Sequence, residues 1–318
     1  MRIGATLASA LLAVLDRPSV WPLALAAFLI RGGWLLIIAP IVVLPTAVGL
    51  ANVIAPLLED VAFGRRTGEL IVLVGLVLGG TLLWLIGGGV LAAAAEVEAV
   101  RRIAHQPDPP LGLHRTATDT WRTAWRVAVL RLVAHIPFAV ALVWGAARLA
   151  SVGYAELTVP SDVTVPAVWR IVLGAPDAVI AIALTWLFGE AIGAMASRRV
   201  VLAGEAARAA LRGQAGRFFR SPGRPSVLSL LSALVLVVVI AVAGLAAGAA
   251  LDRVRSGFAS GDASVGTTAV LVVFVGLFAG GLVLVALASA WRIAIWTVDT
   301  VPAGDGTFGG VGETRSGD

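Results

Sequence analysis

The stretch that decides the fold is Ser197–Pro225, SRRVVLAGEAARAALRGQAGRFFRSPGRP, which carries seven arginines and one acidic residue between two long apolar runs. An α-helix needs about 20 apolar residues to cross a bilayer. Connections rich in arginine stay on the cytoplasmic side of a membrane. This stretch therefore predicts a polytopic membrane protein and places its own arginines in the cytoplasm.

The composition also indicates a membrane protein. Hydrophobic residues make up 59% of the 318 residues, charged residues make up 14%, and the mean hydropathy is +0.95. Soluble domains are about 45–50% apolar and about 25% charged. The net charge of +5 comes from arginines that lie between apolar runs. This pattern favours anionic lipid as a partner and argues against nucleic acid.

Several residue types that enzymes and metal sites need are missing or scattered. The chain has no cysteine, and all 24 basic residues are arginine. Thiolate catalysis, a Walker A lysine and a Schiff-base lysine are therefore excluded. His105, His114 and His135 share no ligand spacing, which predicts no metal site and no cofactor. No motif of a serine hydrolase, zinc protease or phosphate-binding loop occurs, so we expect a protein that is not an enzyme.

The apolar pattern predicts an all-α bundle of six transmembrane helices in a single domain, residues 1–301. The predicted spans are about 18–44, 69–95, 125–150, 171–196, 225–251 and 268–298. Thr46–Leu58 is also apolar, and the prolines around it predict that it lies on or dips into the outer face. Residues 302–318 are rich in glycine and have no apolar period, which predicts a disordered cytoplasmic tail.

Three amphipathic or small-residue segments each precede a pair of spans: Met1–Leu15, Thr116–Arg126 and Glu205–Arg220. They predict helices that lie in the inner interface. The sequence Arg17–Val20, RPSV, recurs as Arg224–Val227, while the middle copy lacks the proline. We therefore expect a threefold repeat of an interfacial helix and a helical hairpin. The alternative is a chance match in a compositionally biased sequence.

The arginine distribution orients the chain. With both termini inside, sixteen of the 24 arginines fall on the inner side, six fall on the outer side, and Arg31 and Arg131 fall within spans. The positive-inside rule favours this orientation over its reverse. The predicted location is a plasma membrane, with several passes and both termini in the cytoplasm.

Arg131 and Glu190 are predicted to pair within the membrane. Arg131 lies about six residues into the third span and Glu190 about seven residues from the inner end of the antiparallel fourth span, which gives them a similar depth. His135, one turn further along, extends the pair into a candidate proton or anion site. The alternative is structural, with Arg131 reaching the inner headgroups and Glu190 serving only as its partner.

Arg31 is a second charged residue inside a predicted span. It follows Pro18 by thirteen residues, which places it about 20 Å along the first span and beyond the midplane. It is a candidate to bind an anionic headgroup or substrate, because Gly32 and Gly33 can break the helix beside it. The structural alternative is that Arg31 reaches the outer interface or meets Asp177 near the outer start of the fourth span.

The inner arginines are the candidate contacts for anionic lipid or for a partner membrane protein. They are Arg122, Arg126, Arg198, Arg199, Arg208, Arg212, Arg217, Arg220 and Arg224. The alternative is that these charges only enforce topology. Spacing of the GxxxG type, which favours close helix packing, occurs at Gly75 and Gly79, Gly189 and Gly193, Gly244 and Gly248, and Gly276 and Gly280.

Some local patterns carry a family resemblance: Thr120–Arg126 and Glu205–Arg220, each leading into a span, and the closing Ser289–Arg292 with Trp296-Thr297. In these the chain resembles poorly characterised prokaryotic six-helix membrane proteins, including the membrane domain that accompanies some glycerophosphodiester phosphodiesterases. The resemblance implies a membrane module with an accessory role and transfers no active site.

We therefore expect a non-enzymatic scaffold or accessory subunit that engages anionic lipid or a partner protein through its arginine-rich inner face. The alternative is a transporter of a small solute or lipid that uses Arg131, Glu190 and His135, with Arg31 on the other half of the path. An intramembrane enzyme is the third hypothesis.

Overall fold

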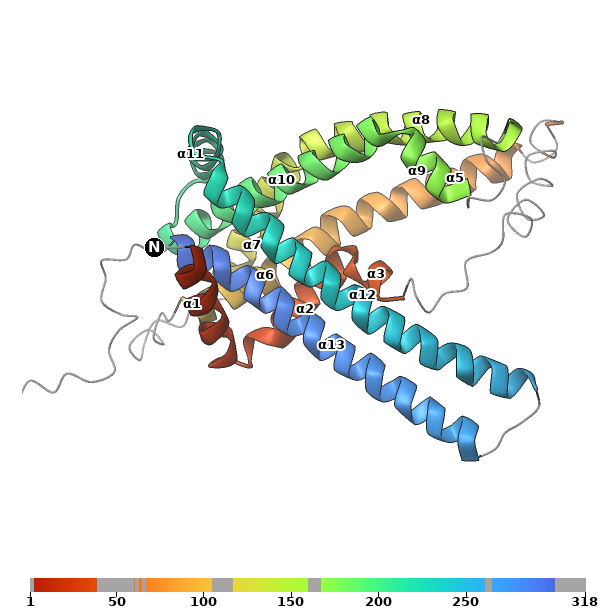
Figure 1. Ribbon diagram of the computed structural model, residues 1–318. Coiled ribbons are helices and arrows are strands. Elements are labelled where there is room, and N and C mark those ends of the chain that lie inside the picture. The colour runs from red at the N-terminus through yellow and green to blue at the C-terminus, as the bar shows by residue number, and fades with distance from the viewer. Residues whose placement is uncertain are drawn as a thin grey trace, which may run out of the picture. The chain divides into compact units, whose positions relative to one another are not determined.

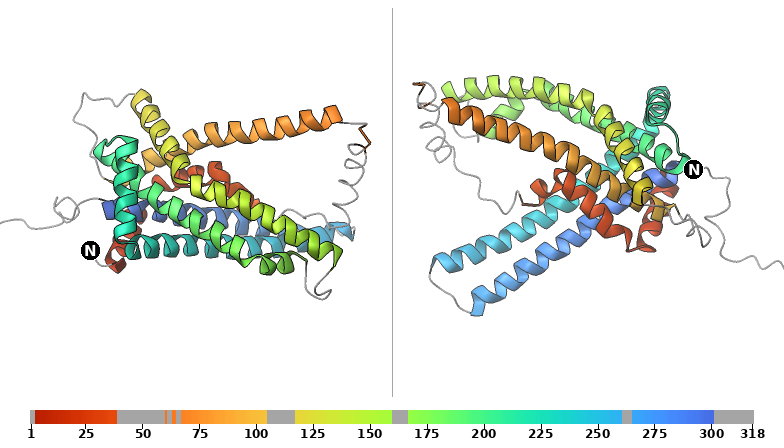
Figure 2. Two further views of the ribbon diagram at one scale, coloured as in Figure 1. Left: turned by 90° about the horizontal axis from the view of Figure 1, so that it is seen from above. Right: turned by 180° about the vertical axis from the view of Figure 1, so that it is seen from behind.

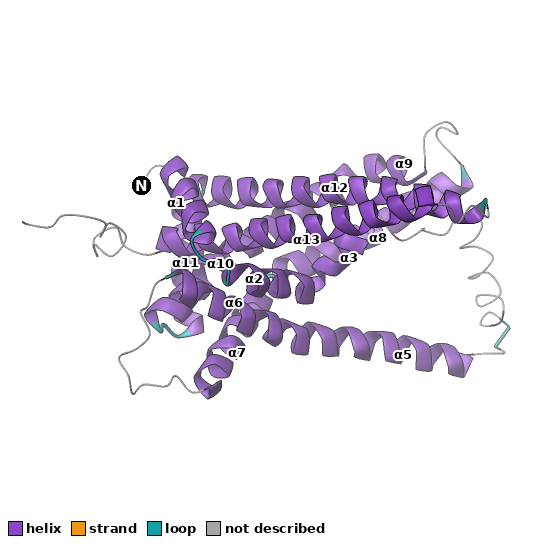
Figure 3. Cartoon of the chain, turned by 90° about the horizontal axis from the view of Figure 1, so that it is seen from below, coloured by secondary structure: helices purple, strands orange, loops and turns teal. Residues whose placement is uncertain are grey.

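The protein is built from helices, as Figure 3 shows for the part that the structure describes. A computed structural model describes residues 3–38, 60, 63–64, 67–104, 117–159, 167–260 and 265–300. These residues contain no strand, so the predicted all-α class is confirmed. Within these described ranges, six helical segments are long and apolar enough to cross a bilayer: Val20–Ile38, Ile71–Ile103, Ile136–Glu156, Pro176–Ala203, Gly223–Ala259 and Val265–Thr300. The chain is therefore an integral membrane protein with several passes. The predictions for Thr46–Leu58 and for residues 302–318 lie outside the described residues.

The chain divides into two compact units, each assembled from separate stretches of sequence. Unit 1 comprises Met1–Val20, Val97–Ala233 and Trp291–Asp318. Unit 2 comprises Trp21–Glu96 and Leu234–Ala290.

Unit 1 is organised around α10 (Pro176–Ala203). Proline opens this helix, and Gly204 ends it with a left-handed φ of +68°, a conformation that suits glycine. α8 (Ile136–Thr158) runs alongside α10, with the short α9 (Ala167–Gly174) between them in sequence (Figures 1 and 2). The C-terminal half of α10 is rich in buried alanine and glycine, which lets neighbouring helices approach closely.

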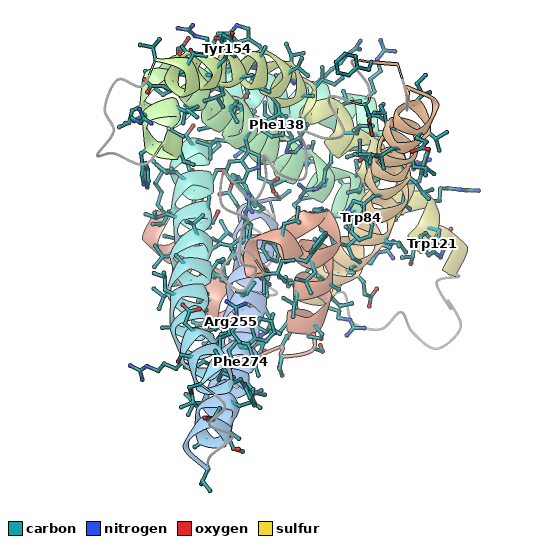
Figure 4. The ribbon with its side chains drawn as sticks, turned by 90° about the vertical axis from the view of Figure 1, so that its right-hand side faces the viewer. Trp84, Trp121, Phe138, Tyr154, Arg255 and Phe274 are labelled. Carbon is teal, nitrogen blue, oxygen red and sulfur yellow. The ribbon has the colours of Figure 1, made fainter. Side chains whose placement is uncertain are left out.

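Two amphipathic helices pack on α10 as well. They are α7 (Ala117–Ala134) and α11 (Ala207–Arg220). Unit 1 also contains α1 (Ile3–Leu15), whose position before the first span matches the predicted interfacial segment. Figure 4 shows Trp121 on α7 and Tyr154 on α8 at the outside of their helices, in line with exposed fractions of 47% and 74%. Such exposed aromatic rings are typical of lipid-facing surface.

The third span begins later than predicted. α7 continues to Ala134, the chain breaks at His135 (φ −95°, ψ 5°), and α8 starts at Ile136. The cause is Pro137, which has no N–H to donate and whose ring clashes with the carbonyl four residues earlier. The predicted span of 125–150 is therefore wrong at its start, and Arg131 belongs to the end of α7.

Unit 2 contains two irregular spans. The first consists of α2 (Val20–Phe28), the π-helical turn η1 (Leu29–Gly33) and α3 (Trp34–Ile38), with Gly32 at φ +97°. The second consists of α5 (Thr67–Leu83), the π-helical turn η2 (Trp84–Gly88) and α6 (Gly89–Ile103). The two π-turns meet, because a Cβ on Gly88 would lie 3.4 Å from Ile30 Cγ2. Runs of glycine thus produce both the distortions and the close contact.

The last two spans are the long antiparallel helices α12 (Gly223–Ala259) and α13 (Val265–Thr300). They have 37 and 36 residues, or about 55 Å each at 1.5 Å per residue, and they run side by side (Figure 1). In unit 2 they approach closely at Gly281, where a Cβ would lie 2.8 Å from Ala243 Cβ. Leu236, Val285 and Ala288 form the buried apolar cluster of this region.

Candidate functional site

Glu190 on α10 is surrounded by three basic side chains of unit 1. Its Oε1 lies 3.2 Å from Arg131 Nη1 and 3.2 Å from Arg292 Nη2, and its Oε2 lies 3.6 Å from His135 Nε2. Arg131 comes from α7, His135 from the break before α8, and Arg292 from α13. We call these four residues the Glu190 cluster.

Glycines on α10 make room for the cluster. At Gly189 a Cβ would lie 2.9 Å from the backbone oxygen of Ala134 and 3.2 Å from the His135 ring. One turn later, the nearest atoms to a Cβ on Gly193 would be Ala134 Cβ at 3.5 Å and Arg131 Cγ at 3.7 Å. The end of α7 therefore rests on the glycine face of α10, which brings Arg131 and His135 to Glu190. His135 Nδ1 donates to the Arg131 carbonyl at 2.8 Å and holds the ring in place.

The cluster is largely buried and carries unequal charges. The exposed fractions of its side chains are 10% for Arg131, 16% for Glu190, 18% for Arg292 and 23% for His135. One carboxylate faces two guanidinium groups, so the cluster has one positive charge in excess even with a neutral His135. The Arg292 guanidinium also lies 5.7 Å from the centre of the Trp186 ring, within cation–π distance.

The structure brings together Arg131, Glu190 and His135, which the sequence predicted to lie at a similar depth in the membrane. Sequence reasoning missed Arg292, although it had placed this arginine on the inner side. The signal was its depth, since Arg292 lies about six residues before the predicted end of the sixth span and Glu190 about seven residues before the predicted inner end of the fourth. The sequence could not predict the side of the helix on which Arg292 or Glu190 lies, because α10 and α13 are apolar on all sides.

The second predicted intramembrane site is rearranged. Arg31 forms an ion pair with Glu96, whose side chain is only 1% exposed. Asp177, a predicted partner of Arg31, lies 3.6 Å from Arg148. Glu96 lies within the second span, Ile71–Ile103, seven residues before its end. Arg31 therefore meets a partner that the sequence did not suggest. The predicted depth of Arg31 assumed a straight helix, whereas the first span turns irregularly at Gly32.

The seven arginines of Ser197–Pro225 fall into two groups. In the first group the protein itself provides partners. Arg198 is 1% exposed and donates to Ser197 Oγ at 2.9 Å and to the Ile293 carbonyl at 3.4 Å. Arg199 lies 2.8 Å from Glu205. Arg224 pairs with Asp299. The prediction that Arg198 meets lipid is therefore corrected, because its guanidinium is buried.

The second group consists of the four arginines on α11. They are Arg208, Arg212, Arg217 and Arg220. All four are exposed, and none makes an ion pair within the described residues. The opposite face of α11 buries Ala210, Gln214 and Phe218. Arg212, Arg217 and Arg220 line an open hollow of about 340 Å³ together with Gly213, Gly216 and Ser221.

Two features fix the rotation of α11. The Phe218 ring packs edge-on against Phe188 of α10, with ring centres 5.4 Å apart. The neighbouring Phe219 is 72% exposed on the other side of the helix. An exposed aromatic ring beside a row of arginines is typical of a helix at a membrane interface. Arg122 and Arg126, the predicted contacts on α7, are exposed as well.

No protein-family model, curated protein or solved structure matches this chain. Among the described residues, no group of three or more histidine, aspartate or glutamate side chains is arranged to hold a metal ion. The function therefore has to be argued from the Glu190 cluster and the α11 surface.

Proposed function

We propose that this membrane protein is a non-enzymatic scaffold or accessory subunit that holds anionic lipid headgroups through the arginine face of α11. The proposal places α11 at the cytoplasmic surface of a plasma membrane. The resemblance to the membrane domain of some glycerophosphodiester phosphodiesterases implies the same accessory role.

The division of the arginines carries this proposal. If the arginines of Ser197–Pro225 only set the membrane topology, all of them would be expected to have similar surroundings. Instead, protein carboxylates and carbonyls bind three of them, while the positive charges on α11 have no such partner in the described residues. Arg199 and Arg224 have carboxylate partners, and Arg198 is buried. The α11 arginines have no carboxylate partner in the described part of the chain. Each basic residue near an anionic surface contributes about 1 kcal/mol of binding free energy.

The hollow on α11 favours the binding of an individual lipid headgroup over a general electrostatic attraction to the membrane surface. Gly213 and Gly216 have nothing within 4 Å of a Cβ position, so a phosphate can approach the helix backbone there. Arginines at both ends of this glycine pair can donate to the same phosphate oxygens. Phe219 beside them supplies apolar area that can enter the acyl region.

The test is a comparison of two triple variants. R212Q/R217Q/R220Q removes the arginines of the hollow, and R148Q/R253Q/R255Q removes three exposed arginines elsewhere. We expect the first variant to lose about 3 kcal/mol of headgroup attraction, or about a hundredfold in affinity for anionic over zwitterionic lipid. The measurement is the lipid retained by purified protein from mixed phosphatidylglycerol and phosphatidylcholine membranes. Equal retention by both variants would contradict the proposal.

A second candidate function is transport. It is favoured by one observation: the charged groups lie at helix irregularities, with Arg31 in η1 and the Glu190 cluster at the His135 break. Broken helices that carry charges are typical of transporter binding sites. In proteoliposomes, movement of fluorescent phospholipid faster than in protein-free vesicles, and slowed by E190Q, would support lipid transport. A rate equal to that of protein-free vesicles would count against it.

A further inference from the structure

One edge of the Arg292 guanidinium makes no hydrogen bond within the described part of the protein. Its Nε and Nη2 atoms are both buried and have no hydrogen-bond partner among the described residues. Nη2 is near Glu190 Oε1, at 3.2 Å, but the two atoms are not aligned for a hydrogen bond. A buried charged donor without an acceptor is costly, so such a group calls for a partner.

The geometry of the Nε–Nη2 edge indicates which kind of anion it can bind. Nε and Nη2 carry parallel N–H bonds, which match two oxygens of one carboxylate or phosphate group. A halide ion offers a single centre and cannot use both bonds equally well. The Trp186 ring lies 5.7 Å from the guanidinium carbon and helps hold the plane of the group. The edge is therefore preorganised for an oxyanion.

The net charge of the Glu190 cluster also favours a bound anion. Arg131 and Arg292 share one carboxylate, Glu190, at 3.2 Å each. A buried positive charge is costly unless it is paired, and one further negative charge would neutralise the cluster. The side chains keep exposed fractions of 10–23%, so the cluster is not sealed by protein.

We infer that the Nε–Nη2 edge of Arg292 binds an oxyanion of one negative charge. Two sources share this chemistry: the phosphodiester of a phospholipid and a small soluble oxyanion. The site is separate from the α11 surface, since none of its residues lies on α11, and it does not depend on the proposed function.

The test uses the full chain in a maltoside detergent, which contains no phosphate. The soluble arm measures the thermal unfolding midpoint by tryptophan fluorescence in nitrate, in phosphate and in chloride at equal ionic strength. The lipid arm measures retained phospholipid by native mass spectrometry. Three proteins are compared. They are the wild type, R292K, which keeps the positive charge and loses the two parallel N–H bonds, and R253Q, which loses an exposed arginine of α12 outside both proposed sites.

A soluble ligand predicts that nitrate and phosphate raise the unfolding midpoint above its value in chloride for the wild type and R253Q. R292K should then bind the oxyanion about ten- to a hundredfold more weakly. A lipid ligand predicts that R292K retains one phospholipid fewer than the wild type and R253Q do. If the wild type retains no phospholipid and does not distinguish oxyanions from chloride, the inference is overturned, whatever R292K does. It is also overturned if R292K behaves like the wild type in both arms.

Discussion

Two glycines one turn apart on α10 provide a sharp test of how the Glu190 cluster is built. A Cβ on Gly189 would lie 2.9 Å from the Ala134 backbone oxygen, which cannot move without shifting the end of α7. A Cβ on Gly193 would make only ordinary contacts, the closest at 3.5 Å. Overpacking of this kind costs about 1–3 kcal/mol, while replacing a helical glycine by alanine gains up to about 1 kcal/mol. G189A should therefore lose about 1–2 kcal/mol net, and G193A should be neutral or slightly more stable.

The assay is thermal unfolding of the purified full chain in detergent, followed by the helical circular dichroism signal. G276A is the matched control, because nothing lies within 4 Å of a Cβ at Gly276. The expected order of midpoints places G189A below the wild type, and G193A and G276A at or above it. A G189A midpoint equal to that of the wild type would refute the argument. So would an equal loss in G193A, because both glycines would then act only through helix flexibility.

Three further predictions follow from particular contacts. E190Q removes the carboxylate that faces both guanidiniums of its cluster and should cost about 3–5 kcal/mol in the same unfolding assay, with E190Q/R292Q recovering part of the loss. R17Q removes two hydrogen bonds to carbonyls at the end of α6 and should cost about 1.5–3 kcal/mol, seen as faster amide exchange there. In intact cells, a thiol at G213C should be shielded from an impermeant reagent and one at S260C should react; the reverse pattern would overturn the predicted orientation.

The spans and the approximate depth of charges could be predicted because hydropathy and helical rise depend on sequence alone. The pairing of Arg131 with Glu190 needed nothing more. The partner of Arg31 could not be predicted, since the π-turn at Gly32 changes both depth and direction. Pro137 could have predicted the helix break before α8. The boundary between α7 and α8 was not predicted, because the sequence is apolar on both sides of this proline.

Rotation about the helix axis was the second source of error. Arg198 and Arg199 are neighbours in sequence, yet one is 1% exposed and the other pairs with Glu205. An apolar helix gives no periodic pattern from which to read its buried face. The amphipathic helices α7 and α11 carried such a pattern, which is why their exposed arginines were the easiest of the nine lipid-contact candidates to place.

The contacts at the span starts bear on the predicted threefold repeat. Arg17 precedes the proline that opens the first hairpin and donates to the carbonyls of Arg102 and Ile103, at the end of that hairpin's second span. Arg224 precedes the proline of the third hairpin and pairs with Asp299, near the end of its second span.

The middle copy lacks a proline directly after its basic residue. Its His135 stands two residues before Pro137 and contacts Glu190, which lies thirteen residues before the end of the second span. Each hairpin is thus closed by a basic residue ahead of its first span. A short sequence match arising by chance would not be expected to bring the same contact with it, so the contacts favour a true repeat. Superposition of the three hairpins remains its test. The middle copy differs in placing its acid inside the span, where Arg292 of the third hairpin also reaches it. The excess positive charge of the cluster therefore arises where the second and third hairpins meet.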